Sequence, residues 1–254
     1  MHAVQVKVIL IGETPDAEAL VASAARLCYA ADTERLFDDK KGQVAMLRRL
    51  RSMRHLSPME HASFTFYIEG VSRAMTHQLV RHRLASYSQR SQRYVAHDGF
   101  DYVLPPRLTG KRVVVSGLSR DAVEYFEETM AILAERYARL NEALGGNGEQ
   151  SNEDARYVLP NACETRIAMT MNARELMHFF EERLCNRAQW EIRLVAGKMR
   201  ELVKKSCPNL FAGCGPKCLR LGRCPEGTMS CGRYKEVCTQ YAERNDESDK
   251  QTER

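Results

Sequence analysis

RHRLASYSQRSQRY, residues 81–94, concentrates positive charge that its neighbours in the chain do not balance. The stretch holds four arginines, and no aspartate or glutamate occurs between Glu69 and Asp98. Like charges at this density repel one another unless an anion lies among them. The serine and tyrosine hydroxyls add neutral donors, which a bound phosphate uses together with charge. The stretch therefore predicts an anion site, with a solvated basic face or a nucleic-acid patch as the alternative.

The composition favours one large domain with an appendage. The chain has 254 residues, 44% of them apolar, and a formal net charge of +5. This mild basicity suits an enzyme for anionic small molecules better than a histone-like binder. The N-terminus lacks a basic segment followed by a long apolar run, and no stretch approaches membrane-spanning length. We therefore expect a cytoplasmic protein that needs neither a membrane nor nucleic acid as partner.

Hydrophobic periodicity predicts strands and helices on both sides of the arginine stretch. Alternation indicates strands at 4–11, 63–69, 100–106 and 163–171, and residues 84–92 are expected to form a polar loop. Apolar spacings of three and four predict helices at 16–29, 43–54, 71–83, 121–144, 152–158 and 187–206. A further helix is expected to begin at the N-cap Asn172, with Glu175 as its capping-box partner.

The sequence gives little support for two common kinds of site, a histidine-rich metal site and a glycine-rich nucleotide site. HLSPMEH, residues 55–61, contains two histidines and a glutamate, but the spacing differs from HExxH and Pro58 interrupts any helical face, which favours a polar turn over a metal site. The chain contains neither GxGxxG nor GxxxxGK[ST], so it carries no sequence signal for a Rossmann or P-loop nucleotide site.

The C-terminal part differs in composition. Five of the nine cysteines lie between Cys207 and Cys231, where glycine and proline are also frequent. In a reducing compartment such clustering suggests metal ligands or free thiols rather than disulfides. Cys214, Cys218, Cys224 and Cys231 could supply four thiolates to zinc, but they form no paired CxxC knuckles, and free thiols remain the alternative. The polar residues after Tyr241 predict disorder.

Three blocks of the chain resemble flavin-dependent thymidylate synthases, the ThyX family. Arg81-His82-Arg83, seven residues and Ser91 resemble the family signature RHR(x)7S. HLSPMEH is similar to the upstream turn of these enzymes, and NARELMHFFEERLCNRAQWEIR, residues 172–193, is similar to their C-terminal helix pair. The resemblance extends from about residue 55 to 207, and the blocks occur in the family's order.

The resemblance implies an α+β fold, with a central, mostly antiparallel sheet packed against long helices, and a homotetramer with sites at subunit interfaces. Residues 1–208 would form the catalytic domain, and residues 209–254 a Cys/Gly-rich tail. The implied reaction is reductive methylation of dUMP to dTMP. It uses 5,10-methylenetetrahydrofolate as carbon donor and FAD, which NADPH reduces. No metal is implied, and side chains of several subunits would surround FAD in place of a GxGxxG loop.

The resemblance also assigns residues to the two ligands. The FAD contacts would be Ser57, Arg81, His82, Arg83, Gln89, Asn172, Arg174 and His178. The dUMP contacts would be Gln78, Leu79, Val80, Arg81, Arg156 and Arg183, with Gln89, Arg90, Ser91, Gln92 and Arg93 of a neighbouring subunit. Arg183 would be catalytic, because its charge can stabilise the uracil as the ring becomes polarised. The sequence departs from the family at Gln89, where glutamate is frequent, and at His178, where some members have asparagine.

Two alternatives concern the chemistry. Ser91 could act as a nucleophile, but a serine hydroxyl needs a positioned base, and the sequence does not indicate one. We therefore expect Ser91 to hydrogen-bond uridylate. No cysteine occupies a recognisable nucleophile motif, which argues against a cysteine-dependent thymidylate synthase. The alternative of another class is a nucleic-acid-binding protein with a basic helix and a zinc-binding tail.

Overall fold

The computed structural model describes residues 1–31, 36 and 42–249. The chain forms two compact units, each assembled from three segments. Unit 1 consists of Met1–Lys7, Ile68–Arg81 and Ser88–Ala168, and unit 2 consists of Val8–Tyr67, His82–Tyr87 and Met169–Arg254. The arginine stretch is thus shared: His82 belongs to unit 2, and residues from Ser88 onward belong to unit 1.

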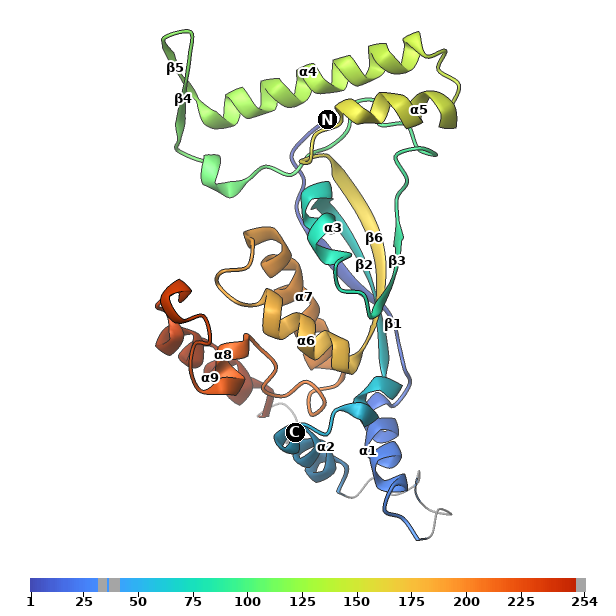
Figure 1. Cartoon of the computed structure of the whole chain (residues 1–254), viewed down its shortest axis with the longest axis vertical. Helices are drawn as coiled ribbons and strands as arrows, with labels where there is room; N and C mark the ends of the chain where they lie inside the picture. The colour runs from blue at the N-terminus through green and yellow to red at the C-terminus, as the bar shows by residue number, and fades with distance from the viewer. Residues whose placement is uncertain (32–35, 37–41, 250–254) are drawn as a thin grey trace. The chain divides into compact units, whose positions relative to one another are not determined.

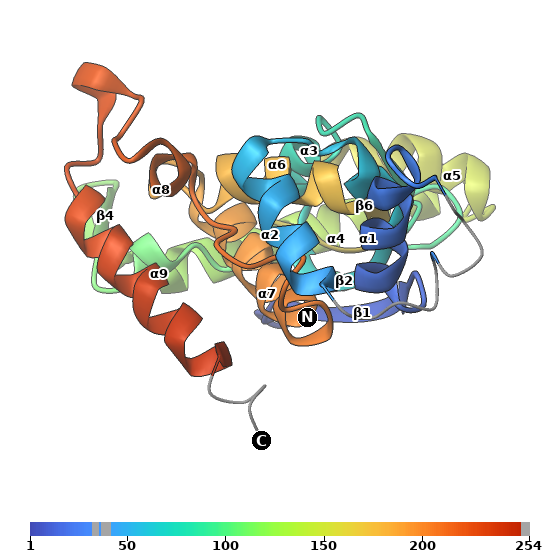
Figure 2. The same ribbon diagram turned by 90° about the horizontal axis from the view of Figure 1, so that it is seen from below.

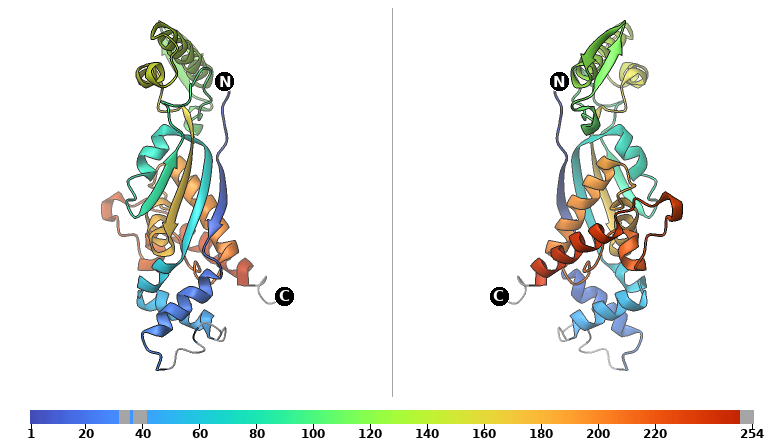
Figure 3. Two further views of the ribbon diagram at one scale, coloured as in Figure 1. Left: turned by 90° about the vertical axis from the view of Figure 1, so that its right-hand side faces the viewer. Right: turned by 90° about the vertical axis from the view of Figure 1, so that its left-hand side faces the viewer.

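A four-stranded sheet has the order β1-β2-β6-β3, which the side views show as adjacent strands (Figure 3). The bounds are β1 Lys7–Glu13, β2 Ser63–Ser72, β3 Ala85–Gln89 and β6 Glu164–Asn172. β1 is antiparallel to β2, because Lys7 Nζ lies 3.0 Å from Glu69 Oε1 whereas Thr14 N donates to Ser63 O. β2 is likewise antiparallel to β6, since the Thr65 and Thr170 hydroxyls share a hydrogen bond and Gly70 N donates to Glu164 Oε1. The predicted strands β1, β2 and β6 are confirmed, with shifted ends.

Unit 1 contains a long helix packed beside a short one. Its elements are α3 Arg73–Leu79, η2 Pro106–Leu108, β4 Arg112–Val115, β5 Leu118–Asp121, α4 Ala122–Ala143, α5 Glu149–Ala155 and η3 Arg156–Val158 (Figure 1). α4 begins where Asp121 Oδ1 accepts from Val123 N and Glu124 N, which satisfies amides at the helix start.

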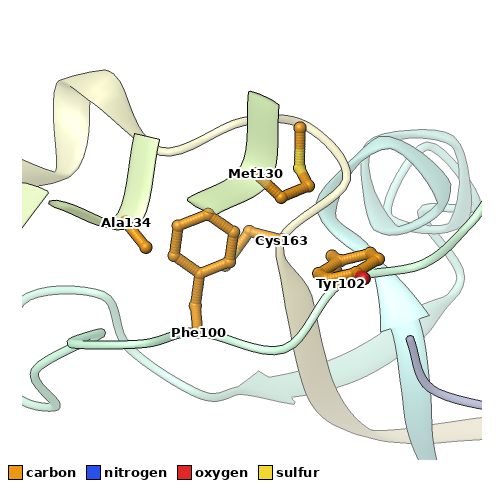
Figure 4. Close-up of a cluster of buried hydrophobic side chains, with 5 residues drawn as sticks. All are labelled: Phe100, Tyr102, Met130, Ala134 and Cys163. Atoms are coloured by element: carbon orange, nitrogen blue, oxygen red, sulfur yellow. The ribbon is translucent and has the colours of Figure 1, made fainter. Parts of the chain in front are cut away.

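The core of unit 1 lies under α4. Phe100, Tyr102 and Cys163 pack with Met130 and Ala134 of that helix (Figure 4). All five side chains are at least nine-tenths buried, so the apolar seam predicted for residues 121–144 contributes directly to this cluster.

Unit 2 is mostly helical. Its helices are α1 Ala17–Leu27, α2 Gln43–Met53, η1 Ser57–His61, α6 Ala173–Arg183, α7 Trp190–Ser206, α8 Lys217–Leu221, η4 Gly227–Met229 and α9 Tyr234–Asp249 (Figure 2). The Phe211 ring lies edge-on to Phe64 at 5.2 Å and to Phe180 at 6.2 Å between centroids. These rings join the residues that follow α7 to β2 and α6.

Several predicted elements differ from the structure. The expected loop at 84–92 contains β3, an edge strand whose polar residues alternate between half-buried and exposed. The helix expected at 71–83 is the shorter α3, because β2 continues to Ser72, whose hydroxyl then accepts from Met75 N as the N-cap. The strand expected at 100–106 is reduced to bridges from Tyr102 to Ala3 and Cys163.

The C-terminal residues lie in unit 2 together with α6 and α7. The polar composition beyond Tyr241 predicts disorder, but α9 continues to Asp249. The last part of that expectation, residues 250–254, lies outside the described residues. No helix among the described residues is long and apolar enough to cross a membrane.

Candidate functional site

In unit 2 a buried histidine connects a carboxylate to the arginine predicted to be catalytic. Arg183 Nε donates to His82 Nε2 at 3.0 Å, and His82 Nδ1 lies 3.3 Å from Glu175 Oε1. Because Nε2 accepts from a guanidinium, the ring proton must be on Nδ1, which donates to the carboxylate. Burial, with the nearby Arg183 charge, lowers the pKa of His82 to about 4. The imidazole is therefore neutral at physiological pH.

The surroundings of His82 hold its position from both sides. Tyr87 Oη donates to the His82 carbonyl oxygen at 2.9 Å, and the Phe179 ring lies edge-on to the imidazole at 4.9 Å. Glu175 is fixed through its backbone, since its N–H donates to the Asn172 side chain at 2.8 Å. The predicted N-cap is thus confirmed, while the Glu175 carboxylate reaches His82.

The same residues could suggest a metal site. His82, Glu175 and His178 offer ligand atoms that all lie within 4.8 Å of one another. Metal binding would require an unprotonated nitrogen, but both His82 nitrogens already have hydrogen-bond partners. His82 and Glu175 are therefore better described as a support for Arg183 than as metal ligands.

A cleft of about 440 Å³ in unit 2 brings together three of the residues assigned to FAD: Asn172, Arg174 and His178. Arg54 also lines it and pairs with Glu181 at 3.2 Å, and Arg174 pairs with Glu60. Two cationic forks, a histidine and an amide provide the donors that a flavin nucleotide's phosphates and polar ring edge require. The residues present therefore fit part of FAD.

Ser57 and Arg83, also assigned to FAD, are exposed and do not line this cleft. Ser57 begins η1, a short 3-10 helix that contains Pro58 near its start and stands where a polar turn was predicted. Across the described residues the Arg83 side chain makes no ion pair or hydrogen bond, which leaves its charge available to a ligand.

In unit 1 the assigned residues at the end of α3 differ in the groups that they expose to a ligand. Leu79 is fully buried, so only its peptide groups could reach a nucleotide. Val80 is exposed, and Gln78 O accepts from Arg81 N at 3.4 Å in the closing turn. The Arg81 side chain is exposed, and none of the described residues pairs with it.

The arginines that follow β3 are compensated in space. Arg93 pairs with Glu149 at 2.7 Å and Glu153 at 2.6 Å, and Arg90 lies 3.7 Å from Glu164. Arg156 Nε donates to Glu153 O, so Arg156 and Arg93 both contact Glu153. The absence of nearby acidic residues in sequence did not reveal these partners, because all of them are more than 50 residues away.

The neutral residues of this segment have internal partners. Gln89 Nε2 donates to Thr76 Oγ1 at 3.0 Å and Thr165 Oγ1 at 3.2 Å. Ser91 Oγ accepts from the backbone of Arg93 and Tyr94, and Gln92 lies against Cys163. Two N–H donors on its oxygen make Ser91 a weaker nucleophile, which favours the hydrogen-bonding role over covalent attack.

Sequence reasoning missed the residues that support the predicted site. Glu175 was expected only as a capping partner and Tyr87 only as one of the hydroxyls available to a phosphate, and Thr76 and Thr165 had no expected role. Their partners are brought close only by the fold, so periodicity and local motifs carry no signal for them.

Comparisons with known proteins agree with these observations. The model of the family described as "Thymidylate synthase complementing protein" matches residues 9–209. A flavin-dependent thymidylate synthase of Clostridium tetani is 48% identical over 238 residues, which cover 91% of this chain and 95% of that protein. The enzyme of the same name from Geobacter sulfurreducens is 50% identical over 236 residues, covering 91% and 96%.

A solved structure is also similar. The UMP/dUMP methylase PolB from Streptomyces cacaoi, bound with 5-Br dUMP, aligns with a TM-score of 0.69 and 28% identity, covering 83% of this chain and 94% of that one. The matched family model covers most of β1 and all of β2, β3, β6, α6 and α7, and includes the Arg81–Ser91 signature. The chain therefore belongs to the family of flavin-dependent thymidylate synthases.

Proposed function

We propose that this protein converts dUMP to dTMP by reductive methylation, with FAD as its cofactor and 5,10-methylenetetrahydrofolate and NADPH as co-substrates. The observation that carries the proposal is the family match over residues 9–209, which includes the signature from Arg81 to Ser91. When bound, FAD supplies the hydride transfer that completes the methyl group. Residues 1–208 would be the catalytic part of each subunit in a homotetramer, and residues 209–254 a tail.

Arg183 is the residue that we expect to act on the uracil. Its Nε is held by His82, so the terminal guanidinium nitrogens are the ones left to face a ligand. A fixed cation stabilises negative charge that develops on the polarised pyrimidine without having to reorganise during the reaction. Because His82 is neutral, it holds Arg183 by a hydrogen bond without neutralising the positive charge of the guanidinium.

The flavin contacts divide between those that line the cleft, Asn172, Arg174 and His178, and those outside it, Ser57, Arg81, His82, Arg83 and Gln89. Asn172 and Arg174 lie at the N-terminus of α6, where backbone N–H groups and the helix dipole also favour anions. Uridylate would be held by Gln78, Leu79, Val80, Arg81, Arg156 and Arg183, with Gln89, Arg90, Ser91, Gln92 and Arg93 of a neighbouring subunit.

The proposal is tested by assaying dTMP formation with purified protein and each ligand omitted in turn. We expect yellow protein whose flavin absorbance is bleached by NADPH, and turnover that requires dUMP and the folate. Arg183→Lys should lower kcat roughly 100-fold, because an ammonium does not reproduce the guanidinium fork. Arg187→Lys is the matched control, since Arg187 is exposed and pairs with Glu226.

Colourless protein that binds DNA with a steep salt dependence would instead support the nucleic-acid-binding alternative. Equal kcat for Arg183→Lys and the wild type would remove Arg183 from the proposed mechanism.

Sedimentation analysis should give four times the 29.0 kDa chain mass, and a stable monomer would contradict the tetramer.

A further inference from the structure

Four cysteines of unit 2 line one cavity of about 260 Å³. Cys185 follows α6, Cys218 lies in α8, and Cys224 and Cys231 lie on either side of η4. All nine cysteines of the chain are free thiols in the structure. The folded arrangement therefore brings together a set of thiols that the spacing in the sequence only partly indicated.

The set differs from the four cysteines grouped by spacing. Cys214 lines another cavity, together with Cys238, and its thiol is buried beside Arg51 and Arg200. Burial raises the pKa of Cys214 to about 11, which makes it a poor source of a thiolate. Cys185, which lies outside the tail, takes its place in the cavity.

The segment that carries Cys224 and Cys231 has almost no core of its own. From Arg220 to Arg233 every residue is exposed except the half-buried Cys224. Its link to the rest of unit 2 includes an ion pair from Glu226 to Arg187 at 2.7 Å, and an exposed pair of this kind contributes little. Small folded units without a core of their own often depend on disulfides or metal ions, and a metal ion would supply fixed contacts that this segment otherwise lacks.

Thiolates that share one cavity repel one another. A divalent cation removes the repulsion and stabilises all the thiolates together.

We propose that Cys185, Cys218, Cys224 and Cys231 bind one Zn²⁺ ion in a closed, four-thiolate structural site that fastens the tail to the end of α6. Four thiolates match the ligand number and softness that zinc prefers in such sites. Among the described residues, the ligand atoms already within 4.8 Å of one another are those of His82, Glu175 and His178, not these sulfurs. Binding therefore requires the four sulfurs, which line one cavity, to move closer together, and the exposed segment that carries Cys224 and Cys231 permits this.

The test uses the full-length protein, purified with reductant after growth in medium supplemented with zinc. We expect one zinc per chain by elemental analysis, released as the thiols react with a mercurial. Replacement by Co²⁺ should produce thiolate-to-cobalt charge-transfer absorption, with the flavin spectrum subtracted. Each of Cys185→Ser, Cys218→Ser, Cys224→Ser and Cys231→Ser should lower the zinc retained against a chelator roughly 10-fold or more.

Cys28→Ser and Cys214→Ser serve as controls, because Cys28 is exposed and neither residue lines this cavity. Both variants should retain one zinc per chain. Wild-type protein without zinc or a cobalt–thiolate spectrum, with its thiols reduced, would overturn the proposal, and this result needs no variant to fold. Loss of zinc in Cys214→Ser with retention in Cys185→Ser would overturn the assigned ligands. Disulfides recovered among the four cysteines of metal-free protein would overturn the zinc site in favour of a redox role.

Discussion

At the scale of single residues, the bonds of His82 determine how Arg183 is presented. The imidazole can accept from Arg183 only while its proton stays on Nδ1, and Glu175 is the acceptor that keeps it there. Glu175 is itself buried, which raises its pKa. We therefore regard Glu175 as a positioning residue, whose effect on the substrate passes through two hydrogen bonds.

Replacing Glu175 with glutamine tests this role. The amide can donate to His82 Nδ1, which would move the ring proton to Nε2 and turn the acceptor for Arg183 into a competing donor. We expect kcat for dTMP formation to fall about 10-fold. Losing a partner that orients a site residue through a hydrogen bond typically lowers activity about 10- to 100-fold, and this is the lower end of that range. Steady-state assays with dUMP varied will separate this loss from a change in KM.

Glu182→Gln is the matched control. Glu182 is on the same helix but is exposed and lies 3.5 Å from Lys217, so its loss should leave kcat close to the wild-type value. A Glu175→Gln enzyme with unchanged kcat would show that Arg183 does not depend on the His82 tautomer.

The sequence indicated which residue types gather in the site but not how they bond. The motif around His82 and the Asn172 cap were recognisable locally. The bond from His82 to Glu175 joins residues 93 positions apart, and the pairs of Arg93 lie 56 and 60 positions away, because Glu149 and Glu153 are on α5. Only the folded chain brings such partners together.

At the scale of elements, two helices begin in the same way but in different units. Asn172 caps α6 through Glu175 N, and Asp121 caps α4 through Val123 N and Glu124 N. Replacing either residue with alanine should destabilise the protein by about 1 kcal/mol. Asn172→Ala should also weaken FAD binding, because Asn172 lines the cleft and Asp121 does not.

Thermal unfolding and a titration of FAD into flavin-free protein measure the two effects separately. The expected result is a similar fall in Tm for both variants, with a raised Kd for FAD only in Asn172→Ala. Equal Kd values for both variants would remove Asn172 from the flavin site.

Elements with an apolar face of their own were predicted more accurately than elements that are fixed by pairing with the rest of the sheet. α4 and α7 were predicted well because their apolar faces repeat at helical spacing over several turns. β3 was missed because ASYSQ has no apolar face, and its place in the sheet comes from pairing with β6. α3 was predicted too long because nothing in the local pattern indicates that β2 continues into Ser72.

At the scale of the whole molecule, we expect stability to fall as the pH decreases from about 6.5 to 4. The folded protein holds His82 neutral with a pKa lowered to about 4, whereas the unfolded chain binds a proton at the ordinary value near 6.5. The unfolded state thus binds more protons in this range. The free energy of unfolding contributed by His82 should decrease by at most about 1.4 kcal/mol for each pH unit crossed.

This dependence is measured as the difference in unfolding free energy between flavin-free wild type and His82→Gln across the same pH range. The comparison is needed because burial raises the pKa of Glu175, which acts in the opposite direction. The wild type should lose more stability than the variant as pH falls. Parallel curves would contradict a neutral, proton-excluding His82.

The order of the strands and the division into units lay beyond prediction from sequence. The family resemblance implied a mostly antiparallel sheet, and the pairs β1–β2 and β2–β6 confirm that direction. Each unit, however, is assembled from three separate segments, with boundaries inside all four strands of the sheet. Local periodicity cannot reveal such boundaries, because a strand has the same pattern on both sides of them.

The carboxylates on Arg93 have a consequence for nucleotide entry. In the proposed site a phosphate does not fill an open cationic pocket; it exchanges with Glu149 and Glu153, which already bind the guanidinium. Uptake of substrate would thus release α5 from Arg93, and affinity would reflect the difference between the phosphate contact and the two carboxylate pairs that it replaces. Such an exchange discriminates against weak anions, because only a dianion that binds better than two carboxylates can displace them.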